Sequence, residues 1–271
     1  MPPDLASRIT VTCFAGSYGV GLALEAARSL WPRLPAWPVQ AFVGAGVFAQ
    51  ALFLWHRGVE QGRLPIAAPF DALLTVSLAL AALHLYLALR DRRQNTGLFL
   101  LPGALGLALL AAWKYSRDGS DPALGRNIVG IAHGVLLLLG AALAAAAMAA
   151  AAAYLAKSRQ LRTGQFLDRV RLPSLERLDR MASGAALWGW PLFTLGVLLG
   201  FALRGLAWSD PKVWTTVAAW LAYAGLAQYR QRPEHRGRKF AWFTLAAGAL
   251  VLFAVLADPL LGTSHQSRPA P

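Results

Sequence analysis

Residues 128–156, IVGIAHGVLLLLGAALAAAAMAAAAAYLA, decide the fold class of this chain because the whole stretch lacks acidic, lysine and arginine side chains. An α-helix needs about 20 predominantly apolar residues to cross the roughly 30 Å hydrocarbon core of a bilayer. A helix buried in a soluble protein has no need of so long an uninterrupted apolar run. The stretch therefore predicts a membrane-spanning helix.

Seven further apolar stretches repeat this character along the chain. The eight predicted spans cover about residues 9–27, 37–55, 69–89, 98–113, 128–156, 184–203, 213–227 and 240–261. Only 14% of all residues are charged, whereas a soluble domain carries about 25%. The sequence thus predicts an all-α polytopic membrane bundle of about eight transmembrane helices, forming a single transmembrane domain over residues 1–271. The fourth stretch is short and contains Pro102 and Gly103.

The basic residues concentrate in alternate connections between the predicted spans. Residues 157–180 hold seven Lys or Arg against three acids, and residues 230–239 hold five against Glu234 alone. The connections after the first and third spans add Arg28, Arg33, Arg90, Arg92 and Arg93. With eight spans all four connections fall on one side, and basic loops face the cytoplasm. The pattern predicts that both termini lie outside, and it explains the net charge of +13 without a nucleic-acid partner.

Five histidines are the main residues that could carry chemistry. His133 lies about five residues inside the outer end of the fifth predicted span, and His265 lies just beyond the outer end of the eighth. His56 is also on the outer side, whereas His84 is in the inner half of the third span and His235 is in an inner loop. A single interfacial histidine is often only a polar group near water, but two neutral imidazoles on one face can ligate haem iron.

The surroundings of His133 leave two interpretations open. Gly130 and Gly134 flank it at a spacing that suits either close helix packing or a flat macrocycle beside the histidine. The spacing taken alone favours helix packing, because small residues four apart let transmembrane helices approach each other closely.

A short outer segment, LAWSDPKVW at residues 206–214, contains two tryptophans and an acid. Asp210 followed by Pro211 is typical of a helix start, with the acid as N-cap and the proline at the first helical position. Tryptophans at span ends are typical of the membrane interface. Capping explains the Asp-Pro pair but not Trp208 and Trp214.

The order of these features resembles the cytochrome c assembly membrane family, which includes haem-handling CcsA- and ResC-like proteins and smaller HemX-like relatives. The resemblance covers about residues 65–265 and rests on FDAL at 70–73, His133, LPSLERLDR at 172–180, GWPLFTLG at 189–196 and Ser-His at 264–265. The LPSLE run followed by the PLFTLG run is its most specific part.

The resemblance implies a haem-handling protein of cytochrome c maturation, in the cytoplasmic (inner) membrane of a bacterium. By the family pattern, haem b is held at the outer face with His133 and His265 as axial ligands to the iron. Trp208, Asp210 and Trp214 would shape the outer pocket. The implied role is binding and transfer rather than catalysis, with a second cytochrome c assembly membrane subunit and apocytochrome c as partners.

The chain also departs from the family pattern at two positions. Ser209 stands where the family usually has a tryptophan before the acid, and Gln228 replaces a histidine that full-length members carry near the inner end of a span. These differences point to the reduced, HemX-like members. His84 lies at a similar depth and could substitute for the missing inner histidine.

Two other functions remain open from the sequence. HemX-like relatives are linked with control of tetrapyrrole synthesis, so a non-enzymatic regulator or scaffold is one of them, and the basic loop at 157–180 could dock a cytoplasmic enzyme. A small-solute transporter is the other, but it needs polar residues along the spans, and this chain has few.

Overall fold

The structure, a computed structural model, describes residues 10–31, 33–62, 64, 68–91, 95–114, 128–163, 172–204, 211–231 and 237–260. These residues form eight α-helices and no strand, which confirms the all-α prediction. The helices are α1 (Val11–Leu30), α2 (Trp37–Gln61), α3 (Pro69–Arg90), α4 (Gly97–Lys114), α5 (Ile128–Thr163), α6 (Leu175–Arg204), α7 (Pro211–Gln231) and α8 (Arg238–Leu260).

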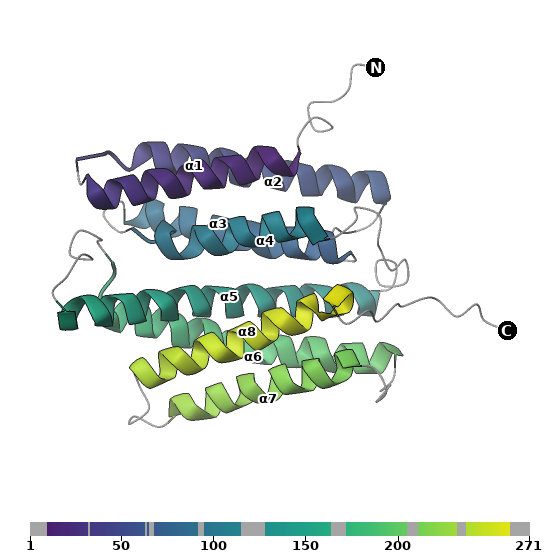
Figure 1. Cartoon of the computed structure of the whole chain (residues 1–271). Coiled ribbons are helices and arrows are strands. Elements are labelled where there is room, and N and C mark those ends of the chain that lie inside the picture. The colour runs from purple at the N-terminus through teal and green to yellow at the C-terminus, as the bar shows by residue number, and fades with distance from the viewer. Residues whose placement is uncertain are drawn as a thin grey trace, which may run out of the picture.

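The helices lie roughly along one direction and form two groups, α1–α4 and α5–α8 (Figure 1). The main contacts between the groups join α3 and α4 to α5. The start of α1 and the end of α8 lie at the same end of the bundle (Figure 1), as an even number of crossings requires. We call this end, where α5 and α7 also begin, the predicted outer end, and the opposite end the predicted inner end.

The surface of the bundle is suited to lipid. Among the described residues, α2, α3, α5 and α6 are long and apolar enough to cross a membrane, and α4 contributes a shorter apolar helix over Gly97–Trp113. Large apolar side chains face outward, including Trp113, which is 80% exposed, and Trp188, which is 73% exposed. Such a surface is stable in hydrocarbon rather than in water. The chain is therefore a multi-pass helical membrane protein.

The α1–α4 group encloses polar side chains that the hydropathy of the sequence does not reveal. Arg57 on α2 donates from Nε to Oδ1 of Asp71 on α3 at 2.7 Å, and both side chains are buried. Tyr18 on α1 donates its hydroxyl to the Gln50 amide oxygen, and Gln50 donates from Nε2 to the Leu74 carbonyl at 3.0 Å. These bonds satisfy buried polar groups and fix α1, α2 and α3 against one another.

Candidate functional site

The predicted outer site is described in part. His133 lies in the second turn of α5, and Trp214 lies in the first turn of α7, where its side chain is 58% exposed. Both helices begin at the predicted outer end. Trp208, Asp210 and His265 lie outside the described residues.

The His133 imidazole is held against α6 by a hydrogen bond. Its Nδ1 lies 2.6 Å from the carbonyl oxygen of Gly196, and the ring is partly buried. Because a carbonyl oxygen can only accept, Nδ1 must carry the proton, so in the neutral ring the lone pair is on Nε2. Histidines that ligate metals commonly donate their other ring N–H to a backbone carbonyl in this way, which fixes the tautomer and the ring orientation.

Glycines of α6 make room for this ring and for the close approach of α5. A Cβ atom on Gly200 would lie 2.6 Å from Cε1 of His133, and one on Gly196 would lie 2.8 Å from Cδ2 of Leu137. On α5, a Cβ on Gly140 would lie 3.2 Å from the Phe193 backbone. Gly140, Gly196 and Gly200 therefore serve the close packing of α5 on α6, whereas the interpretation of the Gly130 and Gly134 spacing stays a prediction.

Replacing Gly200 with alanine is expected to lower the stability of the protein, because the added methyl group meets the His133 ring. Overpacking of this kind costs about 1–3 kcal/mol. Gly16→Ala is the matched control, since a Cβ at Gly16 meets nothing within 4 Å. Thermal unfolding of the purified protein in detergent measures both changes. Equal stability of the two variants would contradict the close packing of His133 on α6.

His56 lies at the same end of the bundle, on α2. Its Nε2 is 3.1 Å from Oε1 of Glu60, one helical turn further along the same helix. His56 thus belongs to the α1–α4 group, whereas His133 belongs to the α5–α8 group. The described contacts give His56 a partner on its own helix and do not bring it to His133.

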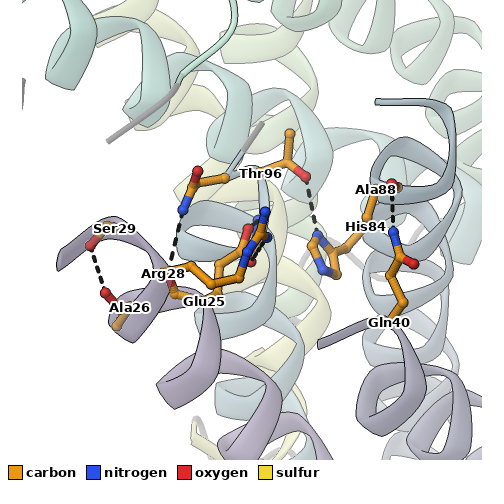
Figure 2. A network of polar contacts seen from close by, with 10 residues as sticks. Glu25, Ala26, Arg28, Ser29, Gln40, His84, Ala88 and Thr96 are labelled. Atoms are coloured by element: carbon orange, nitrogen blue, oxygen red, sulfur yellow. Dashed lines mark hydrogen bonds and ion pairs between the residues drawn. The ribbon is translucent and has the colours of Figure 1, made fainter. Parts of the chain in front are cut away.

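A second polar cluster lies at the predicted inner end, around the start of α4 (Figure 2). Glu25 of α1 is 1% exposed; it accepts a bond from Arg28 Nη1 at 2.8 Å and one from the Gly97 backbone N–H at 3.4 Å. The Asn95 amide donates to the backbone carbonyl of Glu25 at 3.4 Å. A carboxylate at a helix N-terminus is stabilised by the unpaired N–H groups and by the helix dipole. Glu25 therefore caps α4 from a neighbouring helix.

His84 belongs to this inner cluster and is fully buried. Its Nδ1 is 3.2 Å from Oγ1 of Thr96, as Figure 2 shows, and a Cβ on Gly97 would lie 2.9 Å from its Cε1. Gln228 is exposed on α7, in the other helix group. The described contacts of His84 are thus within the α1–α4 group. They do not connect His84 to Gln228, the residue at the position where full-length family members carry an inner histidine.

Glu25 and Gln50 are not among the residues predicted from the sequence, and Asp71 is predicted only as part of a motif. Each lies within a predicted apolar span, where an average over the stretch hides a single polar side chain. One signal was available for Glu25: an acid followed three residues later by Arg28 can form an ion pair within one helix.

The chain matches proteins of one family over most of its length. The sequence model described as Cytochrome C assembly protein matches residues 66–264. The cytochrome c biogenesis protein CcsA of Thermosynechococcus vestitus is 24% identical to this chain over an alignment of 283 positions. The alignment covers 86% of this chain and 89% of that protein. CcsA of Gloeothece citriformis is 25% identical over an alignment of 296 positions, which covers 88% of this chain and 89% of that protein. Among solved structures, none matches the chain significantly.

The match and the resemblance from the motifs cover nearly the same stretch of the chain. The relatives support the CcsA side of the resemblance, while the HemX-like assignment stays a prediction. Because the family model spans well over half of the sequence, this protein belongs to the cytochrome c assembly protein family.

Proposed function

We propose that this protein acts in cytochrome c biogenesis by holding haem at the predicted outer end and passing it to apocytochrome c. Membership of the cytochrome c assembly family and similarity to CcsA proteins support the biogenesis role. The observation that carries the haem site is the bond from His133 Nδ1 to the Gly196 carbonyl. That bond leaves the lone pair on Nε2, the nitrogen that an iron ligand needs.

The residues that would hold the haem come from three parts of the chain. His133 and His265 would supply the two axial imidazoles, and Trp208, Asp210 and Trp214 would shape the pocket. Haem b would supply an iron that imidazole nitrogens can ligate. Indole rings pack well against flat aromatic surfaces, and the exposed Trp214 lies at the same end of the bundle as His133.

The role proposed is binding and transfer, without bond-breaking by this chain. A second cytochrome c assembly membrane subunit and apocytochrome c would be its partners, and the bacterial cytoplasmic membrane its location. The Gly196 and Gly200 surface would keep the His133 ring in one orientation, so that the haem is presented in a fixed geometry to the acceptor.

The amount of mature c-type cytochrome in cells that make this protein is the measurement that tests the proposed function. Replacing both His133 and His265 with alanine is expected to reduce haem-stained cytochrome c to near the level of a strain lacking the protein. His56→Ala is the control, since His56 lies at the same end of the bundle but pairs with Glu60 on its own helix. Unchanged cytochrome c in the deletion strain would contradict the proposal. If tetrapyrrole levels then changed instead, the protein would be a regulator of tetrapyrrole synthesis.

A further inference from the structure

A cavity of about 390 Å³ lies in the seam between the two helix groups, in the predicted inner half of the bundle. Four helices line it: α3 and α4 from one group, α5 and α6 from the other. Its walls include Leu83 and Leu87 of α3, Ala150 and Ala153 of α5, and Met181 and Ala185 of α6.

The cavity suits an apolar chain rather than water. Among the described residues that line the cavity, Thr96 supplies the single hydroxyl, and this hydroxyl is already bonded to His84. An apolar cavity of about 150 Å³ stays dry and binds benzene, and small-ligand sites usually occupy about 300–1,000 Å³. Trp188 lines the cavity and is 73% exposed, so the cavity opens sideways onto the lipid-facing surface.

Charged side chains continue the lining at the predicted inner end. On α5, Lys157 follows Ala146, Ala150 and Ala153 at helical spacing, and therefore lies on the same face of the helix. The cavity is thus apolar along α5 and ends beside a cation.

The faces of α6 and α3 that line the cavity also end beside charged side chains, a cation on α6 and an acid after α3. Arg177 lies one turn before Met181 on α6, and Asp91 follows one turn after Leu87 of α3. Arg177 Nη1 is 3.9 Å from Oδ2 of Asp91, with side chains 40% and 35% exposed. An exposed pair at this distance is weak, so Arg177 is able to bind another anion. With Lys157, the rim has more positive than negative charge.

We propose that this cavity binds one anionic phospholipid of the inner leaflet. An acyl chain would enter beside Trp188 and lie along the alanine face of α5, and the headgroup phosphate would contact Arg177 and Lys157. Basic pockets between transmembrane helices on the cytoplasmic side are suited to anionic lipid headgroups. The lipid would fill the seam and join the two helix groups. The proposal does not depend on the haem site, which is at the opposite end of the bundle.

Native mass spectrometry of the purified full chain tests the site with two lipids that have the same acyl chains, phosphatidylglycerol and phosphatidylcholine. We expect one tightly bound phosphatidylglycerol and roughly tenfold weaker phosphatidylcholine, because each basic side chain favours an anionic headgroup. Lys157→Gln combined with Arg177→Gln should remove this preference. Arg180→Gln, which changes a 71% exposed arginine paired with Glu176, should keep it.

Gly184→Leu tests whether the apolar cavity holds the acyl chain. Gly184 lines the cavity and a Cβ there meets nothing within 4 Å, so a leucine side chain can start from this position and extend into the cavity. It should lose both lipids, while Gly16→Leu, at a similarly open position on α1, should bind as wild type. If Gly184→Leu does not fold, the charge variants still decide the matter.

Several results would overturn the proposal. Equal binding of the two lipids to wild type, or an unchanged preference in the variant with Lys157→Gln and Arg177→Gln, would remove the headgroup contact. Full lipid binding by folded Gly184→Leu would place the lipid elsewhere. Release of phosphatidylglycerol on addition of haem would assign the cavity to haem. Release of phosphatidylglycerol when the chain forms a dimer would assign the cavity to a second copy of the chain.

Discussion

Replacing His133 with glycine is expected to lower the affinity of the protein for haem by roughly 100-fold or more. Loss of a group that only orients a metal ligand costs about 10–100-fold in affinity, and loss of the ligand itself costs at least as much. The glycine variant also leaves a space beside Gly196 and Gly200 that the imidazole ring had filled. Free imidazole should enter that space and restore haem binding. Titration of haem into the protein in detergent, with and without imidazole, measures both effects.

His56→Gly is the control for this titration. His56 lies at the same predicted outer end but is paired with Glu60 on its own helix, so its loss should leave haem affinity unchanged. Wild-type affinity in His133→Gly would remove His133 from the site. His133→Gly could also lose haem, gain nothing from added imidazole and still unfold at the wild-type temperature. That result would mean that His133 influences haem binding without ligating the iron.

Replacing Asp71 with alanine is expected to destabilise the protein by about 3–5 kcal/mol, the usual result of removing one partner of a buried ion pair. Arg57 would keep its charge in a site where its side chain is 10% exposed, and where its Cζ lies 5.0 Å from the centre of the Phe70 ring. Chemical unfolding in detergent measures the change in free energy. Glu176→Ala is the control, because its pair with Arg180 is 80% and 71% exposed and contributes about 0–1 kcal/mol.

A double variant separates the cost of burying the Arg57 charge without Asp71 from the value of the pair. Arg57→Met with Asp71→Leu removes both charges and keeps the volume, and replacements of this kind are often neutral or stabilising. We expect most of the stability lost in Asp71→Ala to be recovered. A double variant as unstable as Asp71→Ala would show that the ion pair itself, rather than an Arg57 charge that has lost Asp71, determines the stability of α2 against α3.

Hydropathy predicted where helices cross the membrane better than where they end. The stretch 98–113 forms α4 over Gly97–Lys114 even though Pro102 lies inside the helix, beyond its first turn, where a proline removes one backbone hydrogen bond. α5 and α6 are longer than their apolar stretches: α5 continues to Thr163 and α6 begins at Leu175. Hydropathy measures the part of a helix that suits hydrocarbon, and polar turns beyond it can continue the same helix.

The candidate site could be predicted as a set of residues but not as a geometry. His133 was identified from its position near a span end and from the order of motifs around it. Its partner, the Gly196 carbonyl, is a backbone atom 63 residues away on another helix, and residue type carries no signal for such a contact. The same limit applies to Glu25 and Gly97, which are 72 residues apart and meet only after α1 and α4 have packed.

The absorption spectrum of the purified protein shows whether His133 and His265 hold haem. Wild type prepared from cells with ample haem should show the intense Soret band of bound haem, with the visible bands of iron held by two imidazoles. Folded protein with both His133→Ala and His265→Ala should show neither. Wild type without haem under these conditions, or an unchanged spectrum in the double variant, would contradict the account.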